Sequence, residues 1–133
     1  MLLQSIDRPA TTAVVDVADI ADGWRGVDIG PHSAERFAAL IAGAGTVLWN
    51  GPMGVFEDPR FETGTRSVAE SVASSAAYTV VGGGDTVAAV DRFGVSDRID
   101  HVSTGGGAML EFVERGDLPG LKALRDSLAL QHS

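Results

Sequence analysis

Residues 78–90 read YTVVGGGDTVAAV, a run that changes from a strand pattern to a helix pattern across three consecutive glycines. Residues 78–81 are apolar on both faces, which is typical of a buried strand. Val87, Ala88 and Val90 then form the apolar side of a short predicted helix. The arrangement recurs 23 residues later in VSTGGG, residues 102–107. Two glycine turns are therefore expected at the carboxyl edge of one parallel sheet, where open α/β folds bind ligands.

The same alternation of strand and helix extends over the rest of the chain. Further short buried strands are predicted at residues 13–17 (AVVDV), 46–49 (TVLW) and 99–102 (IDHV). Helical spacing predicts three more apolar helix faces: Phe37, Leu40, Ile41 and Ala44; Val68, Val72, Ala73 and Ala76; and Met109, Leu110, Phe112 and Val113. Strands that are apolar on both faces and joined through helices favour a parallel sheet covered on both sides. The predicted fold class is α/β, a parallel sheet with flanking helices in a partial Rossmann-like three-layer domain.

Composition limits the class of protein. The chain has 133 residues, 44% of them hydrophobic, which predicts one compact domain over residues 1–133 with disordered ends at 1–12 and 127–133. The net charge of −8 and the lack of a basic run argue against a nucleic-acid partner. The absence of cysteine excludes disulfides, zinc–thiolate sites and a cysteine nucleophile. No signal peptide or long apolar run is visible, so we expect a cytoplasmic protein without a membrane partner.

The first glycine turn has two interpretations. Three glycines allow a tight reversal into the helix, and they also let a phosphate approach bare N–H groups at the positive end of that helix. The turn matches neither GxxxxGK[ST] nor GxGxxG, so a Walker-type ATPase and an ordinary dinucleotide fold are excluded. Asp85 and Thr86 follow the glycines and are predicted either to cap the helix or to serve a phosphate site. In the second case Asp85 would bind Mg²⁺, because a hard cation bridges a carboxylate and a phosphate.

The segment WNGPMGVFE, residues 49–57, follows the predicted strand at 46–49. It is predicted either as a plain turn with Trp49 in the core, or as a nucleotide loop in which Asn50 and Pro52 line a base pocket and Glu57 binds ribose. His101 lies in an apolar strand and is predicted to be a core histidine. No Ser-His-Asp arrangement is visible. The sequence therefore shows no obvious general base. One reaction that needs none is phosphoryl transfer onto a carboxylate, because that acceptor carries no proton at neutral pH.

Taken together, four motifs resemble the phosphoglycerate kinase family, and the last part of its nucleotide-binding C-terminal domain in particular. They are GWRGVDIGP (23–31), LWNGPMGVFE (48–57), VVGGGDT (80–86) and HVSTGGGA (101–108), and the resemblance covers about residues 13–125. It implies phosphoryl transfer between 1,3-bisphosphoglycerate and MgADP, giving 3-phosphoglycerate and MgATP in glycolysis.

The resemblance also implies roles for individual residues. The adenosine pocket would include Asn50, Pro52 and Val55, and Glu57 would hold the ribose. The nucleotide phosphates would meet Gly82, Gly83 and Gly84, with Asp85 on Mg²⁺ and Thr86 on a phosphate oxygen. The catalytic glycines Gly105, Gly106 and Gly107 would face the transferring phosphoryl group. The implied ligands are therefore ATP or ADP as substrate and Mg²⁺ as cofactor.

The family chain is roughly three times as long and has two lobes. The resemblance therefore implies that 3-phosphoglycerate binds only with the missing N-terminal lobe, and we expect the isolated chain to be inactive. Two alternatives remain: a non-catalytic remnant that binds MgADP or MgATP, and an interaction fragment that docks on a complementary lobe. The strand at 46–49 is expected to have an exposed edge, which could also support self-association.

Overall fold

The computed structural model describes residues 1–103. The strands are β1 (Leu2–Ser5), β2 (Thr12–Val14), β3 (Trp24–Asp28), β4 (Thr46–Asn50), β5 (Tyr78–Gly82) and β6 (His101–Ser103). The α-helices are α1 (Pro31–Ala42), α2 (Thr63–Ser74) and α3 (Gly84–Arg92), and the short 3-10 helices are Val17–Asp19, Pro59–Phe61 and Ser96–Arg98. The helix face at 109–113, the second glycine turn at 105–107 and the C-terminal end at 127–133 lie outside the described residues.

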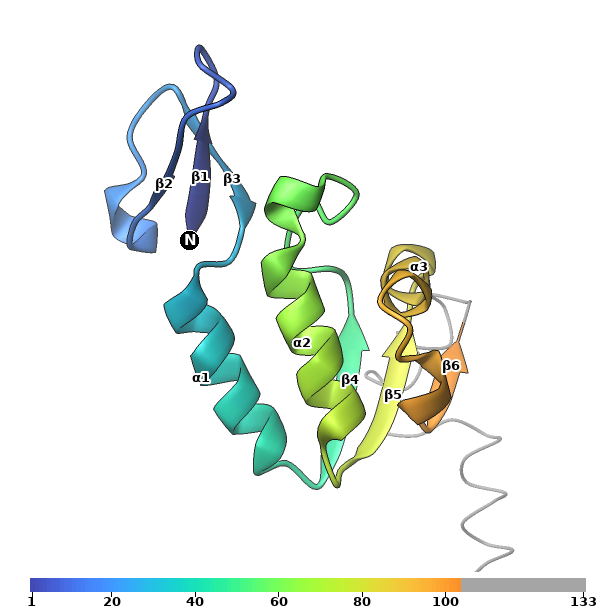
Figure 1. The fold of residues 1–133 in the computed structure, drawn as a ribbon. Helices are drawn as coiled ribbons and strands as arrows, with labels where there is room; N and C mark the ends of the chain where they lie inside the picture. Colours follow the sequence, from blue (N-terminus) through green and yellow to red (C-terminus); the bar gives the residue numbers. More distant parts are fainter. Residues whose placement is uncertain (104–133) are drawn as a thin grey trace, which may run out of the picture.

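A parallel sheet carries the larger half of the fold and confirms the α/β class (Figure 1). Its order is β4-β5-β6, and all three strands run parallel. Trp49 and Val81 are register partners on one face and pack with Val68 and Val72 of α2 and Val90 of α3. Three of the four predicted strands are therefore confirmed, although β6 begins two residues later than expected.

The N-terminal part differs from the prediction. Residues 2–5 form the central strand of a second, antiparallel sheet of order β2-β1-β3, so the expected disorder over 1–12 is wrong for this strand. The predicted buried strand at 13–17 is also wrong: β2 is an edge strand, and Val14 and Val17 are 58% and 70% exposed. A short apolar run predicts extended backbone but does not fix its partner, which here is the strand at 2–5.

The first predicted helix forms and Ile41 packs against the core, but the described residues leave part of its apolar face uncovered. Phe37 is 39% exposed and Leu40 is 68% exposed. Together with β4 and α2 they border an open groove of about 220 Å³, lined by Phe37, Leu40, Ile41, Val47, Leu48, Trp49, Met53, Val68 and Val72. Among the described strands β4 pairs only with β5, so the groove lies beside a sheet edge. None of the described helices is long and apolar enough to span a membrane.

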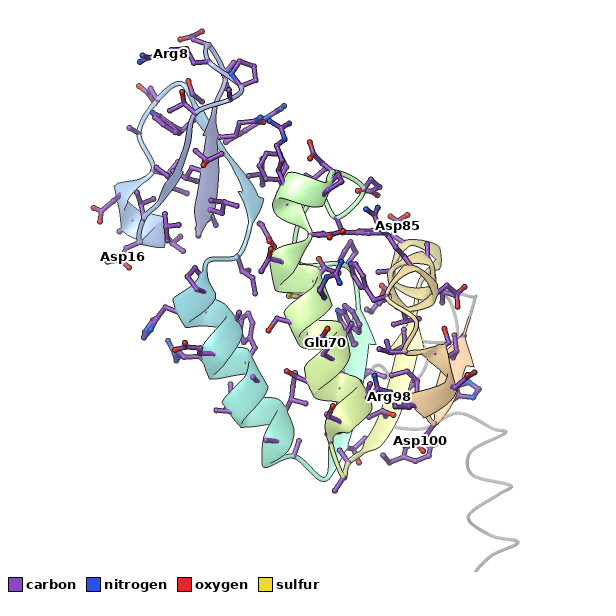
Figure 2. The ribbon with its side chains drawn as sticks, in the orientation of Figure 1. Arg8, Asp16, Glu70, Asp85, Arg98 and Asp100 are labelled. Atoms are coloured by element: carbon purple, nitrogen blue, oxygen red, sulfur yellow. The ribbon has the colours of Figure 1, made fainter. Side chains whose placement is uncertain are left out.

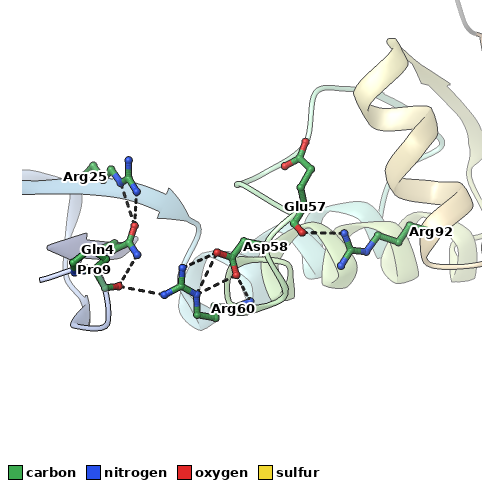
Figure 3. A network of polar contacts seen from close by, with 7 residues as sticks. All are labelled: Gln4, Pro9, Arg25, Glu57, Asp58, Arg60 and Arg92. Atoms are coloured by element: carbon green, nitrogen blue, oxygen red, sulfur yellow. Dashed lines mark hydrogen bonds and ion pairs between the residues drawn. The ribbon is translucent and has the colours of Figure 1, made fainter. Parts of the chain in front are cut away.

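The small sheet is tied to the segment that follows β4. The Arg60 guanidinium donates to the carbonyl oxygen of Pro9 (3.3 Å), and the same oxygen accepts from the buried Gln4 amide (2.6 Å) (Figure 3). Arg60 is itself held by Asp58 at 2.7 Å. The backbone N–H of Val55 also donates to the carbonyl of Val27 in β3 (2.8 Å). These bonds fix residues 50–57, called the 50–57 loop from here on, against the small sheet.

Candidate functional site

The carboxyl ends of the three parallel strands lie side by side. The register pairs Asn50 with Gly82 and Gly82 with Ser103, so these three residues form one row across the sheet. The first predicted glycine turn and the 50–57 loop therefore emerge from neighbouring positions at the same edge. Asp85 lies at this end of the sheet, and Asp100, which precedes β6, lies at the opposite end (Figure 2).

Gly83 occupies a backbone conformation that favours glycine. Its φ is +89°, and a Cβ atom there would lie 2.6 Å from Oδ1 of Asn50. The side chain of Asn50 thus reaches across to the turn that follows the neighbouring strand. Asn50 and Gly83, which are both predicted to bind the nucleotide, are therefore adjacent in the structure.

Gly84 has neither of these constraints. Its φ is not positive, and a Cβ atom would meet no atom of residues 1–103 within 4 Å. It is the first residue of α3, where the backbone N–H groups have no partner within the helix, and the N-cap Gly83 provides no side-chain acceptor. No described residue therefore blocks an anion that approaches the positive end of α3 in front of Gly84.

Thr86 does not cap α3. Its side chain is 1% exposed, and its Oγ1 accepts a hydrogen bond from the backbone N–H of Gly51 at 2.7 Å. The hydroxyl thus joins the first turn of α3 to the start of the 50–57 loop. This position leaves the hydroxyl proton as the donor that the Thr86 side chain could offer to a phosphate.

Asp85 lies in the first turn of α3, is exposed and likewise does not cap the helix. No hydrogen bond or ion pair to its carboxylate occurs within residues 1–103. The described residues contain no group of three or more His, Cys, Asp or Glu side chains that could hold a metal. A single free carboxylate beside an anion site fits Mg²⁺, because this ion is usually held by one or two carboxylates together with substrate phosphates.

The 50–57 loop combines a buried anchor with exposed side chains. Trp49 is 5% exposed, and its indole N–H donates to the carbonyl of Gly51 at 2.7 Å, which confirms its predicted place in the core. Pro52 is half-buried, Val55 is 48% exposed and Glu57 is exposed. The Glu57 carboxylate has no hydrogen-bond partner in the described part of the chain. The predicted nucleotide-binding side chains of this loop are therefore accessible.

Asp28, for which the sequence predicts no role, joins β3 of the small sheet to the start of α2. Asp28 is 5% exposed, and its two carboxylate oxygens accept from the backbone N–H groups of Ile29 and Gly64, each at 2.8 Å. A side chain at Gly64 would collide with this carboxylate. Burial raises the pKa of Asp28, and the two N–H donors oppose that increase. A carboxylate between the apolar residues Val27 and Ile29 was the available signal.

The remaining predicted residues are less informative. His101 is exposed, so its predicted place in the core is wrong. His101 is the first residue of β6, the last described strand, and lies at the surface. Gly105, Gly106 and Gly107 lie outside the described residues. The described arrangement offers one open helix N-terminus, one free carboxylate and an adjacent loop with accessible apolar and acidic side chains.

The chain is similar to known proteins of one family. The phosphoglycerate kinase family profile matches residues 2–116. The chain is 52% identical over 130 residues to the phosphoglycerate kinase of Chloroflexus aurantiacus, covering 96% of this chain and 32% of that one. It is 58% identical over 116 residues to that of Parafrankia, covering 86% and 29%.

Solved structures give the same result. The phosphoglycerate kinase of Coxiella burnetii superimposes with a TM-score of 0.76 at 44% identity, covering 91% of this chain and 32% of that one. The enzyme of Pyrococcus horikoshii gives a TM-score of 0.70 at 36% identity, covering 96% and 32%. The chain thus spans about a third of the length of these relatives. On its motifs, fold and relatives, this chain belongs to the phosphoglycerate kinase family.

Proposed function

We propose that the chain carries the last part of a phosphoglycerate kinase nucleotide-binding domain and binds MgADP or MgATP. The observation that supports this most directly is the open space in front of Gly84. Among the described residues, glycine there needs no positive φ and relieves no collision, whereas the lack of a side chain would let a phosphate approach the backbone N–H groups closely. In a complete cytoplasmic enzyme the reaction would be glycolytic phosphoryl transfer between 1,3-bisphosphoglycerate and MgADP.

The proposed roles follow the geometry of the strand ends. Asn50, Pro52 and Val55 line the adenosine side, and the accessible Glu57 carboxylate accepts hydrogen bonds from the ribose hydroxyls. Residues 82–84 bind the phosphates through backbone N–H groups, and Thr86 donates its remaining proton to a phosphate oxygen. Asp85 would hold Mg²⁺, which when bound neutralises phosphate charge. Gly105, Gly106 and Gly107 would face the transferring group.

These residues would act by position and charge. The N–H groups at the start of α3 point to where negative charge gathers on the phosphates, and their orientation is fixed by the fold before the ligand arrives. The matched relatives are about three times as long as the chain. We therefore expect the 133-residue chain to show no turnover by itself, because positioning of the second substrate supplies much of the catalysis.

The proposal is tested by titrating the ¹⁵N-labelled chain with ADP, with and without Mg²⁺, and following backbone amide shifts. We expect saturable shifts at Gly83, Gly84 and Thr86, with a Kd in the millimolar range or weaker, about 4 kcal/mol of binding free energy. Gly84→Ala should fold normally and bind more weakly, since the added methyl group fills only the ligand space. Gly45→Ala is the matched control, because that Cβ also meets nothing. Equal affinity of the Gly84→Ala variant and the unmodified chain would contradict the phosphate role.

A second candidate function is supported by the groove between α1 and the β4 edge. We propose that it docks a complementary part of a kinase chain, which would supply a further strand for β4 and apolar side chains for Phe37 and Leu40. An unpaired edge and an exposed apolar patch are common features of an interaction surface.

This second proposal predicts a one-to-one complex between the chain and a polypeptide containing the part of the Chloroflexus relative that the chain does not match. Light scattering after size exclusion measures the complex. Leu40→Glu should abolish it, whereas Val17→Glu, at a similarly exposed apolar residue in the 3-10 helix after β2, should not. A dimer of the chain that also disappears with Leu40→Glu would show self-association instead.

A further inference from the structure

Helix α3 contacts the 50–57 loop at both of its ends. At the N-terminal end the Thr86 hydroxyl accepts from the Gly51 N–H (2.7 Å). At the C-terminal end Arg92 donates to the carbonyl oxygen of Glu57 (3.3 Å), as Figure 3 shows. Helix α3 thus connects its own N-terminal end, the proposed phosphate site, to Glu57 at the end of the loop.

The C-terminal contact has a buried support. Phe56, which precedes Glu57, is 4% exposed, and its ring meets the ring of Phe93 edge to face, with centroids 6.4 Å apart. Phe93 directly follows Arg92. Two consecutive residues of the loop therefore contact two consecutive residues at the end of α3, which fixes the direction of the backbone at Glu57.

Arg92 is itself held in place by α2. Its second nitrogen lies 3.0 Å from one carboxylate oxygen of Glu62, and the other oxygen of Glu62 takes Arg66 at 2.6 Å. The Arg66 guanidinium lies 4.9 Å above the Phe93 ring. A network of three charged side chains on two helices therefore orients the guanidinium that meets the Glu57 carbonyl.

The Glu57 side chain takes no part in these contacts. Its carboxylate points away from Arg92 in Figure 3 and has no hydrogen-bond partner among the described residues. Its backbone is held, while its charged end remains available. We infer that Arg92 is a positioning residue that sets the distance between the Glu57 carboxylate and the phosphate-binding end of α3. This inference rests on the proposed function and identifies the ligand it favours as one that carries both a diphosphate and free ribose hydroxyls.

The test compares MgADP with Mg-2′,3′-dideoxy-ADP, which lacks the hydroxyls that Glu57 would bind. Amide-shift titrations of Arg92→Ala should give about fivefold weaker binding of MgADP and unchanged binding of the dideoxy nucleotide. Arg92→Lys should recover part of the loss, since it keeps a donor for the Glu57 carbonyl. Arg98→Ala is the matched control, because the Arg98 side chain makes no hydrogen bond or ion pair with the loop.

Each outcome decides between explanations. Equal weakening of both nucleotides by Arg92→Ala would show that Arg92 only supports the fold, and would overturn the inference. An unchanged affinity for MgADP would overturn it as well, while the proposed function would stand. If the unmodified chain bound neither nucleotide, the proposed function would fail and the inference with it. A double variant with Glu57→Gln should bind MgADP no more weakly than Glu57→Gln alone.

Discussion

Replacement of Asp28 by alanine is expected to lower the free energy of unfolding by about 3 kcal/mol, because two buried N–H groups lose their acceptor. The carboxylate holds Ile29 and Gly64, each at 2.8 Å, and thereby joins the small sheet to the start of α2. Urea unfolding followed by tryptophan fluorescence, from Trp24 and the buried Trp49, measures the change. Asp28→Asn, which keeps one acceptor, should lose less and should remain folded if the alanine variant does not.

The same residue predicts a pH dependence with a defined sign. Burial raises the pKa of Asp28 in the folded chain above its ordinary value of 3.8. A group with a raised folded pKa contributes stability that is complete below the unfolded pKa and is lost as pH rises through the folded one. The stability difference between the unmodified chain and Asp28→Asn should therefore be largest below pH 3.8 and should shrink toward neutral pH. A difference that does not change with pH would contradict this assignment.

Asp58 provides the control of opposite sign. Hydrogen bonds from Arg60 lower the pKa of this exposed carboxylate. Its contribution is therefore present above its unfolded pKa and is lost as pH falls through the folded pKa. Asp58→Ala should have only a small effect on stability, because the pair is solvent-exposed. Opposite signs of the two pH dependences would match a pKa raised by burial at Asp28 and one lowered by hydrogen bonds at Asp58.

Substitution of Asp85 by asparagine is expected to remove the dependence of ADP binding on Mg²⁺. In the unmodified chain we expect Mg²⁺ to strengthen ADP binding by about tenfold, since the ion can bridge the free carboxylate and the phosphates. In Asp85→Asn the affinity with Mg²⁺ should fall to the value without it. Calorimetric titration with ADP at constant ionic strength, with and without Mg²⁺, measures both affinities.

The control for this substitution is Asp91→Asn, an exposed aspartate near the other end of the same helix. It changes the net charge by the same amount but leaves the N-terminal end of α3 intact. Its Mg²⁺ dependence should equal that of the unmodified chain. If Asp85→Asn also retained the full dependence on Mg²⁺, the metal-binding role of Asp85 would have to be abandoned.

Local sequence was sufficient for the central strand, the glycine turn and the helix that follows it. The apolar run at 78–81, the glycines and the spacing of residues 87–90 act within a few residues of each other, so their pattern predicts their conformation. The adjacency of the 50–57 loop and the glycine turn also followed, since parallel strands bring their carboxyl ends to one edge. The structure confirms this adjacency through the pairing of Asn50 with Gly82.

The remaining features depend on residues far apart in the chain. Residues 2–5 have no strand pattern of their own and become a strand by pairing with β2 and β3. The contacts between Asp28 and Gly64, Gly51 and Thr86, and Glu57 and Arg92 each span 35 or 36 positions. Hydrophobic periodicity predicts which face of a segment is apolar, but not what covers it, as the exposed Leu40 shows. The sequence alone therefore determined the strand–turn–helix unit and the family, whereas tertiary packing decided which carboxylates are buried, paired or free, because burial and pairing depend on neighbours that only the folded chain brings together.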